Sequence, residues 1–313
     1  MKGSMWTTLA AAALVAACAG ETADDGGAAA GTAASAPGWQ ELRDSTARVA
    51  VVDGLSGPEA VKYDPDQDVW FVSNFGDGSE QPDGDGFIAR VSPDGAIEEL
   101  AYMRGTEAAP LEDPRGMALR GDTLWVADAA GVHGFDRRTG AHAAFVDFRS
   151  LAPGFINDLA FGPDGELYAT DTGRSRVYRV SGGVAEIAAE DPRLGPPNGI
   201  VWDEGREAFL LGTWGGDRTL RTWSPGGAIE DVATSEAGAN FDGVELWDGR
   251  AVLASQADSS LHVMEGSTTR PFLRVPGRPA DIAIDTRRGR VAVPYIALDR
   301  VDVWDLPRDP AGG

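Results

Sequence analysis

Several features that mark common classes of protein are missing from this sequence. Its 313 residues include a single cysteine, Cys18, so disulfides cannot stabilise the folded domain. Basic residues are outnumbered by acidic ones, 27 to 49, and the formal net charge of −22 repels phosphate backbones and anionic lipid, which argues against nucleic-acid binding. The sequence has no Gly-x-Ser-x-Gly elbow and no phosphate-binding glycine loop. A serine esterase of the α/β-hydrolase type is therefore disfavoured.

A short apolar run extends from Met5 to Ala17 at the N-terminus. It is too short for a stable transmembrane helix and has the form of the hydrophobic region of a signal peptide. Cys18 follows Ala17 directly, an order that resembles the bacterial lipobox, in which such a cysteine is lipidated. An ordinary signal peptide with a chance cysteine is the alternative. We therefore expect residues 1–18 to be a lipoprotein-type signal peptide that ends at the lipidation site Cys18.

The residues after this signal divide by composition into a tether and a folded domain. Residues 19–45 are mainly Ala, Gly, Thr, Ser and Asp, which cannot bury enough apolar surface to fold, so we expect a flexible tether. We expect a folded domain over residues 46–306 and a C-terminal tail over 307–313. The chain is then an exported monomer, held in the bacterial cell envelope only by its N-terminal lipid anchor and facing the periplasm or the exterior.

A repeat of about 40 residues runs through the expected domain. Each copy begins with a polar residue and an alternating apolar strand, continues through a turn rich in Asp, Gly or Pro, and ends in a second apolar strand. The copies begin with the segments 57–74, 113–128, 155–171, 196–213, 240–256 and 278–295. Two further strands follow most copies, for example within residues 87–102 and 176–190.

Four short strands in each of six copies are typical of an all-β fold, a six-bladed β-propeller with four-stranded antiparallel blades. Tandem hairpins could instead form a sandwich, but the regular period and the turns favour the propeller. The sixth copy, which ends near Leu306, has only three clear strands. We predict that Ala47–Leu55 supplies its outer strand and closes the ring, which removes the exposed sheet edges.

A column of mostly polar residues marks the start of the first strand in successive copies. Equivalent positions of rotationally repeated blades lie on a ring about the axis, so these side chains should meet at one mouth of the central tunnel. The column consists of Glu59, Arg115, Asn157, Asn198, Asp242 and Ala280.

Four members of this column carry side-chain oxygen atoms and no His or Cys accompanies them. Glu59 and Asp242 would neutralise a divalent cation, while Asn157 and Asn198 would add neutral oxygens. Such a set selects a hard cation, and we expect Ca²⁺, with Mg²⁺ or another hard divalent ion as the alternative. Asn-Gly and Asp-Gly are also common turn dipeptides, so the prediction depends on the whole column. The three histidines fall in or near outer strands, where we expect structural or exposed roles: His133, His142 and His262.

The sequence around this column resembles the family of senescence marker protein, gluconolactonase and luciferin-regenerating enzyme over about residues 47–306. The matching segments are Gly57-Pro58-Glu59, Asn157-Asp158, Pro197-Asn198-Gly199 and Phe241-Asp242-Gly243. The resemblance implies that Glu59, Asn198 and Asp242 hold a divalent cation and that Asn157 contacts the metal or the substrate. It also implies hydrolysis of a lactone or, as in broader relatives, of an ester.

Two departures from the family pattern concern the substrate. Ala60 replaces the usual Gly after the Glu, and Phe155 replaces an Arg that stands two places before the Asn-Asp pair. In the family that Arg helps to hold polar, sugar-derived substrates, so Phe155 indicates a more apolar ligand. Arg115 is a candidate for the missing positive charge, and a surface Arg is the alternative.

Loops after the second strands should surround the mouth. The loop Phe75–Gly86 is the longest and most acidic, and it could be a lid, a further cation site or a solvated loop. Trp214 and Tyr295 fall in the corresponding loops of copies four and six, where they would form an apolar wall for a substrate. Asp128 and Asp171 close second strands and would add negative charge.

Two functions follow from these residues. The first is a metal-dependent hydrolase for a small lactone or ester, in which the cation polarises the carbonyl group, Asp242 acts as general base and Asn157 orients the carbonyl oxygen. Arg115, Phe155, Trp214 and Tyr295 would then contact the substrate. The alternative is a non-enzymatic envelope propeller that presents its rim to a protein or glycan, a role that suits a tethered lipoprotein.

Overall fold

The computed structural model describes residues 47–76 and 83–307. The predicted signal peptide with Cys18, the tether, the centre of the acidic loop and most of the C-terminal tail lie outside these residues, so those predictions stay untested. Contacts divide the chain into Met1–Ser35 and Ala36–Gly313, and all described residues belong to the second unit. Within the described part of the chain, no helix is long and apolar enough to cross a bilayer.

The described residues form strands β1 to β24, which are grouped in four sheets of four strands and one of eight. The first sheet contains β2 (Pro58–Asp64), β3 (Val69–Asn74), β4 (Phe87–Val91) and β5 (Ile97–Arg104). The second contains β6 (Met117–Arg120), β7 (Thr123–Asp128), β8 (Gly131–Asp136) and β9 (His142–Asp147). The third contains β10 (Ile156–Phe161), β11 (Leu167–Asp171), β12 (Arg176–Ser181) and β13 (Val184–Glu190).

The eight-stranded sheet consists of two antiparallel halves. One half contains β14 (Pro197–Asp203), β15 (Ala208–Thr213), β16 (Thr219–Trp223) and β17 (Ile229–Ser235). The other contains β18 (Phe241–Trp247), β19 (Arg250–Ser255), β20 (Ser260–Glu265) and β21 (Thr268–Arg274). Only a short parallel pairing of β17 with β21 joins them, through Thr234 opposite Thr268 and Ser235 opposite Thr269.

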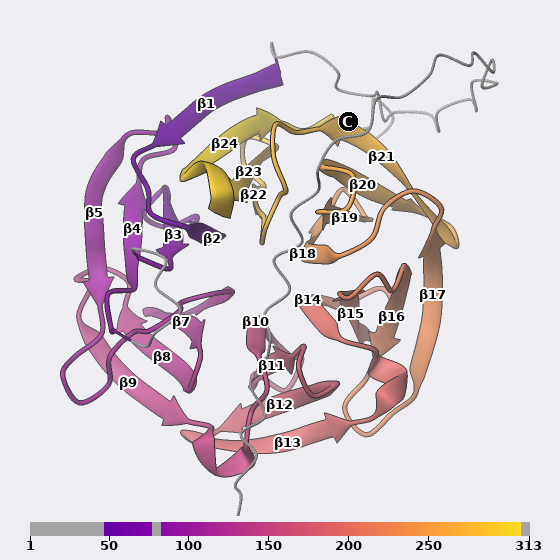
Figure 1. Ribbon diagram of the computed structural model, residues 1–313, viewed down its shortest axis with the longest axis horizontal. Coiled ribbons are helices and arrows are strands. Elements are labelled where there is room, and N and C mark those ends of the chain that lie inside the picture. Colours follow the sequence, from indigo (N-terminus) through magenta and orange to yellow (C-terminus); the bar gives the residue numbers. More distant parts are fainter. Residues whose placement is uncertain (1–46, 77–82, 308–313) are drawn as a thin grey trace, which may run out of the picture. The chain divides into compact units, whose positions relative to one another are not determined.

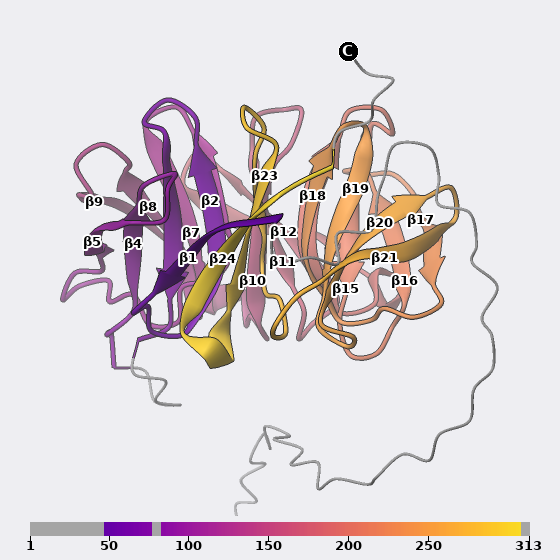
Figure 2. The same ribbon diagram turned by 90° about the horizontal axis from the view of Figure 1, so that it is seen from above.

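The last sheet combines the two ends of the described chain. It contains β1 (Arg48–Asp53), β22 (Ala283–Asp285), β23 (Arg290–Tyr295) and β24 (Arg300–Asp305). Strand β1 pairs antiparallel with β24, from Arg48 opposite Trp304 to Asp53 opposite Arg300. The predicted ring closure by the segment before the first copy is therefore confirmed. The two strands lie side by side both down the axis (Figure 1) and edge-on (Figure 2).

The sheets are arranged as a ring about a central axis, with β2, β10, β14, β18 and β22 innermost (Figure 1). The predictions of an all-β chain and of four-stranded antiparallel units are confirmed. Strand β3 is buried at every position, whereas the outermost strand β13 is partly or fully exposed throughout. This gradient arises because inner strands are covered on both faces by neighbouring sheets, while outer strands meet water.

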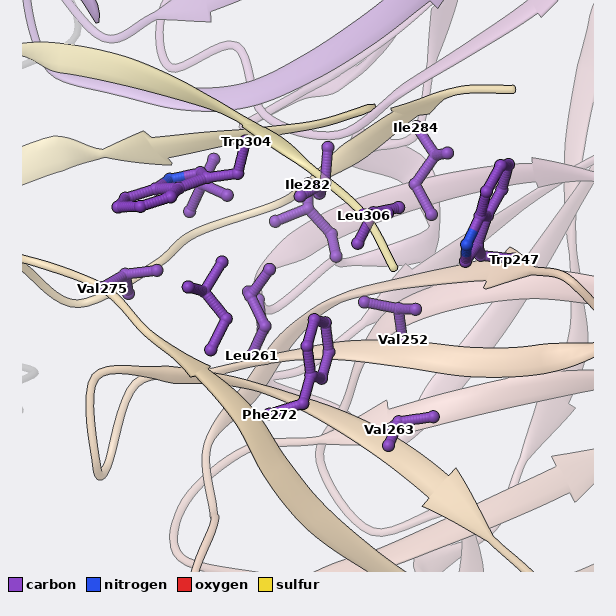
Figure 3. Packing of buried hydrophobic residues seen from close by; sticks show 14 of the residues in the cluster. Trp247, Val252, Leu261, Val263, Phe272, Val275, Ile282, Ile284, Trp304 and Leu306 are labelled. Carbon is purple, nitrogen blue, oxygen red and sulfur yellow. The ribbon is translucent and has the colours of Figure 1, made fainter. Parts of the chain in front are cut away.

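Six apolar clusters fill the spaces between consecutive groups of four strands. In the cluster of Figure 3, Val252 of β19 and Phe272 of β21 pack near Ile282 and Trp304 of the following group. Burying one such large apolar side chain stabilises the fold by about 1.5–3 kcal/mol. Because a cluster also joins the last group to the first, the whole ring is held by the same kind of packing.

Three-residue 3₁₀ helices occur at Arg149–Leu151, Pro192–Leu194 and Ile296–Leu298. Several tight corners between first and second strands are fixed by an Asp at the end of the first strand. Asp64 Oδ1 accepts hydrogen bonds from the backbone N–H groups of Asp66 and Gln67, and Asp203 and Asp285 make the equivalent pair of bonds. An Asp side chain that bonds to the backbone two and three residues on is a known turn former, so these corners follow from local sequence.

Candidate functional site

A cavity of about 400 Å³ lies where the inner strands begin. Its lining combines four of the six members of the expected column with residues that follow the second strands. The lining residues are Glu59, Phe75, Phe155, Asn157, Thr172, Gly173, Asn198, Trp214, Asp242, Gln256 and Ile296. Four inner strands or their starts, in four different groups, thus converge on one site.

The four predicted oxygen ligands all line this cavity, and we call them the oxygen cluster: Glu59, Asn157, Asn198 and Asp242. Each residue is only 3–4% exposed. They belong to β2, β10, β14 and β18, so only ring closure brings them together. The structure therefore places at one point the residues that the repeat pattern assigned to one ring.

Three oxygen atoms of the cluster have no hydrogen-bond partner among the described residues. They are Glu59 Oε2, Asn157 Oδ1 and Asn198 Oδ1, and all three are buried. A buried acceptor without a partner costs about 1–3 kcal/mol, so a ligand that supplies positive charge to these atoms would be stabilising. Together with the Asp242 carboxylate they form an oxygen-only set that fits a hard divalent cation.

Electrostatics in the cavity also favour a cation. Burial, and next the nearby Asp242 carboxylate, raise the pKa of Glu59 well above its usual range, against a lowering effect of Arg115. Burial raises the pKa of Asp242 to about 7, although hydrogen bonds from Gln256 and Asn198 lower it. Two buried carboxylates that resist ionisation together would both ionise readily beside a divalent cation.

The composition of the cluster bears on the choice of metal. The parts of the chain that the structure describes contain no group of three or more His, Cys, Asp and Glu side chains that could hold a metal ion. The oxygen cluster has two carboxylates and two amides, so it depends on neutral oxygen ligands. Ca²⁺ accepts such ligands readily, whereas structural Zn²⁺ sites are built from Cys and His.

The glycines after Asn198 and Asp242 are needed for close packing rather than for turns. Both lie within strands β14 and β18. A Cβ atom on Gly199 would lie 2.3 Å from the backbone oxygen of Asp242, and one on Gly243 would lie 2.5 Å from the backbone nitrogen of Ile282. The turn interpretation of these dipeptides is therefore wrong, because glycine here lets neighbouring inner strands approach.

Gln256 is a functional candidate that sequence reasoning missed. Its Nε2 atom donates a hydrogen bond of 2.5 Å to Asp242 Oδ2, which fixes the orientation of that carboxylate. Gln256 directly follows strand β19. A search for a second column, one residue after each second strand, would have found it together with Phe75, Thr172, Trp214 and Ile296.

Tyr295 does not line the cavity, and its predicted place in the apolar wall is wrong. It is the last residue of β23, 1% exposed, and belongs to the cluster around Trp304 and Leu306. The residue that matches Trp214 is Ile296, one position later. Because successive side chains of a strand point to opposite faces, a shift of one residue moved the predicted contact into the core.

Arg115 is buried, 6% exposed, so the surface interpretation is wrong, and it does not line the cavity. Its guanidinium carbon lies 4.0 Å from the ring centroid of Phe155, and its Nη1 atom donates a hydrogen bond of 3.1 Å to the carbonyl oxygen of Ile156. Phe155, rather than Arg115, therefore forms the surface that a substrate would meet.

Asp128 and Asp171 do not line the cavity either, so they do not add negative charge to it as expected. Asp171 accepts hydrogen bonds of 2.8 Å from the backbone N–H groups of Gly154 and Phe155 and from the hydroxyl of Tyr178. Asp128 accepts equivalent bonds from the backbone before β6. Both carboxylates hold the loops that lead into the inner strands, and Asp171 thereby positions Phe155.

The three histidines lie away from the cavity, as predicted. His133 and His262 are fully buried. His133 Nδ1 lies 3.0 Å from His142 Nε2, and His262 Nε2 lies 2.9 Å from Asp258 Oδ2. These contacts stabilise individual sheets.

A second cavity, of about 230 Å³, lies further along the same inner strands. Its charged lining residues are Lys62, Asp158, Glu245 and Asp281. Lys62 Nζ lies 2.9 Å from Glu245 Oε1. Burial lowers the pKa of Lys62, but the neighbouring carboxylates, Glu245 foremost, outweigh that effect and raise it, so the lysine stays charged. This axial cavity therefore contains a cation that the chain itself supplies.

Comparison of the sequence with protein-family models and with curated proteins gives no match. Solved structures do match the fold. A gluconolactonase from Xanthomonas campestris is 16% identical with a TM-score of 0.63, covering 87% of this chain and 96% of its own. Regucalcin from Agrobacterium tumefaciens, a calcium-binding protein, is 15% identical with a TM-score of 0.60, covering 84% and 95%.

A third solved structure has a different activity. Virginiamycin B lyase from Staphylococcus aureus is 13% identical with a TM-score of 0.55, covering 82% of this chain and 98% of its own. At such identities the likeness concerns the fold alone. In its fold, this chain resembles the gluconolactonase and regucalcin propellers, the family that its sequence motifs indicate.

Proposed function

We propose that this chain is a metal-dependent hydrolase of a lactone or ester, with a divalent cation bound by the oxygen cluster on the axis of a six-bladed propeller. The observation that carries the proposal is the meeting of three buried, unpartnered oxygen atoms with the Asp242 carboxylate in one cavity. Six blades are supported by the two antiparallel halves of the eight-stranded sheet and by the apolar clusters between consecutive groups.

The residues of the chain suit an acyl-transfer step to water. A divalent cation, when bound, supplies Lewis acidity toward the carbonyl group. Asp242 is the candidate general base, since its carboxylate lines the cavity and, once a bound cation favours its ionised form, can accept a proton from an attacking water. Gln256 orients Asp242, and Asn157 contributes an amide that can align the carbonyl oxygen of the substrate.

Solved structures of similar fold include both hydrolases and a lyase, and the residues of this cavity favour the hydrolase. A gluconolactonase and a calcium-binding regucalcin share the architecture, which favours hydrolysis and Ca²⁺. A virginiamycin B lyase variant with a histidine replaced is catalytically inactive, whereas none of the three histidines of this chain lines the cavity. We therefore do not propose for this chain a lyase reaction that depends on a histidine in the cavity.

The test compares Ca²⁺ binding and hydrolysis in the wild type and in Asp242→Asn. We expect the wild type to bind Ca²⁺ in titration calorimetry and to hydrolyse members of a panel of lactones and esters. We expect Asp242→Asn to lose about 10²- to 10⁴-fold in kcat/KM. Glu186→Gln, which removes an exposed carboxylate from the outer strand β13, is the matched control.

Two results would contradict this proposal, the first its mechanism and the second the hydrolase itself. Unchanged turnover in Asp242→Asn would exclude Asp242 as the base. Ca²⁺ binding without hydrolysis of any compound would favour the alternative, a non-enzymatic envelope propeller that binds a protein or glycan at its rim.

We also propose that the domain is exported as a monomer and anchored by a lipid on Cys18, with residues 19–45 as a tether. The support is the apolar run that ends directly before the only cysteine of the chain. Replacing Cys18 by Ser should release the protein from the membrane fraction, while the wild type should show the mass of an acylated N-terminus. A Cys18→Ser protein that stays in the membrane fraction would contradict the anchor.

A further inference from the structure

The cavity has an outer ring of side chains above the buried oxygen cluster. We call it the collar, and its members are Phe75, Phe155, Thr172, Trp214, Gln256 and Ile296. All except Gln256 are partly or fully exposed, whereas the oxygen cluster is buried. A ligand that reaches the cluster must therefore pass the collar and contact it.

The collar is built by a repeated backbone contact. The residue after a second strand donates its N–H group to a carbonyl two residues before the oxygen cluster: Phe75 to Gly57 at 3.0 Å, Thr172 to Phe155 at 2.9 Å, Trp214 to Pro196 at 2.9 Å and Gln256 to Asn240 at 3.2 Å. These bonds fix the backbone of four collar residues relative to the cluster. A rigid rim of this kind selects ligands by shape and polarity because it does not rearrange around each ligand.

The collar presents mainly apolar surface. Phe75, Phe155, Trp214 and Ile296 contribute aromatic or aliphatic side chains, and Phe155 is 44% exposed. An aromatic ring exposed to this degree beside a cavity is suited to contact a ligand.

The polar side chains of the collar are already engaged. The Thr172 hydroxyl donates to the carbonyl oxygen of Pro197 at 2.8 Å, and Gln256 donates to Asp242. The guanidinium group of Arg115 lies against the Phe155 ring and bonds to the backbone, and Arg115 does not line the cavity. Among the described collar residues, hydroxyl groups of a ligand would therefore find few free donor groups in exchange for water, which weakens the binding of a polyhydroxylated compound.

Resting on the hydrolase function proposed above, we infer that the substrate carries an apolar arm that packs against Phe75, Phe155, Trp214 and Ile296 while its carbonyl group faces the oxygen cluster. The chemical class is an alkyl- or aryl-substituted lactone or ester. Polyhydroxylated sugar lactones are poor substrates for this chain. A cavity of about 400 Å³ can enclose a compound of this size.

The test uses δ-lactones that share one ring and differ only in the arm: δ-valerolactone, δ-octalactone, δ-decalactone and glucono-δ-lactone. We expect kcat/KM to rise by about three- to fourfold for each added methylene until the collar is filled. Glucono-δ-lactone should be hydrolysed at least about tenfold less efficiently than δ-decalactone, after correction for its spontaneous hydrolysis.

Variants separate the collar from the reacting groups. Phe155→Ala and Trp214→Ala should each lower kcat/KM for δ-decalactone by about tenfold and change it by less than about twofold for δ-valerolactone. Val184→Ala, which truncates an exposed apolar residue on the outer strand β13, is the matched control and should change neither. Thermal unfolding of each variant verifies that the domain is folded.

The outcomes distinguish this inference from the proposed function. Hydrolysis of glucono-δ-lactone in preference to δ-decalactone would overturn the apolar arm and leave the hydrolase intact. If neither these lactones nor the esters of the first panel are hydrolysed, the hydrolase fails, and binding of the same intact lactones to the wild type in titration calorimetry decides the inference. Tighter binding of δ-decalactone supports it, whereas equal or weaker binding overturns it.

Discussion

The two cavities on the propeller axis differ in how their buried carboxylates are compensated. In the axial cavity, Lys62 pairs with Glu245, and Asp158 accepts hydrogen bonds from the backbone N–H groups of Leu159 and Ile200 at 2.6 and 2.9 Å. In the cavity that contains the oxygen cluster, at the mouth of the tunnel, Glu59 Oε2 has no partner among the described residues. The same inner strands thus carry carboxylates beside a cation of the chain in one cavity and a carboxylate oxygen without a described partner in the other.

This difference separates the two cavities more clearly than the acidity of their carboxylates does. Burial raises the pKa of Asp158 to about 7, and it raises the pKa of Asp242 to the same value. A perturbed pKa alone would therefore assign both residues to a site. Both residues also accept hydrogen bonds, so their neighbours distinguish the two cavities: the Glu59 Oε2 atom near Asp242 has no partner among the described residues, and such a buried acceptor is costly unless a ligand satisfies it.

The largest expected effect is on cation affinity at the mouth. Glu59→Gln removes half of the negative charge of the oxygen cluster and should weaken Ca²⁺ binding by about 100-fold or more. Glu245→Gln makes the same change in the axial cavity, where Lys62 already provides a cation, and should leave Ca²⁺ affinity within about twofold. Titration calorimetry on both variants measures this difference. Equal losses in the two variants would show that the mouth is not the cation site.

The next effect concerns pH. The folded pKa of Asp242 lies above its unfolded value of about 3.9, so the folded state holds more protons between these values and its stability falls as pH rises toward 7. Without a divalent cation, the free energy of unfolding of the wild type should fall by about 2 kcal/mol more than that of Asp242→Asn between pH 5 and pH 8. Saturating Ca²⁺ should abolish this relative loss, since the cation stabilises the ionised carboxylate.

The matching measurement at the axial cavity serves as the control. Asp158→Asn should also remove a loss of folding stability at higher pH, because the pKa of Asp158 is raised like that of Asp242. Ca²⁺ should leave that loss unchanged. A Ca²⁺ effect of equal size on both residues, in urea unfolding followed by tryptophan fluorescence, would remove the distinction between the cavities.

A smaller effect is expected when the internal cation is removed. Lys62→Met leaves three carboxylates of the axial cavity without a positive partner and should lower the free energy of unfolding by about 1.5–2 kcal/mol. The value is below that of a fully buried pair because the side chains of Lys62 and Glu245 are 28% and 20% exposed. Ca²⁺ affinity at the mouth should stay unchanged. A loss of stability together with a loss of Ca²⁺ binding would indicate that the cavities act as one site.

The smallest effect is expected at Gln256. Gln256→Leu removes the hydrogen bond that orients Asp242 and should lower kcat/KM by about tenfold, with little change in the unfolding midpoint. Gln256→Glu keeps the length of the side chain but places a carboxyl beside Asp242, and should lower activity further above pH 7. Wild-type activity in Gln256→Leu would show that Asp242 is held without it.

Sequence reasoning reached the oxygen cluster but only part of the collar. The four residues of the oxygen cluster occupy one column of a repeat, so their convergence could be predicted from the sequence alone. A second column, one residue after each second strand, would have placed Gln256 at the cavity, but its role comes from a contact with Asp242 that only the structure shows. Tyr295 was misplaced by one residue, since the end of β23 is not marked by a turn residue that would fix the alternation.

The sequence by itself determined the repeat, the closure by Ala47–Leu55 and the convergence of the four oxygen-bearing side chains, because equivalent positions of a rotational repeat lie on one circle about its axis. Only the tertiary structure decided which buried carboxylates have partners among the described residues. Lys62 and Glu245 stand in different copies and in no shared motif, and they meet only when the ring closes. Compensation of a buried charge depends on such distances through space, which a linear pattern does not contain.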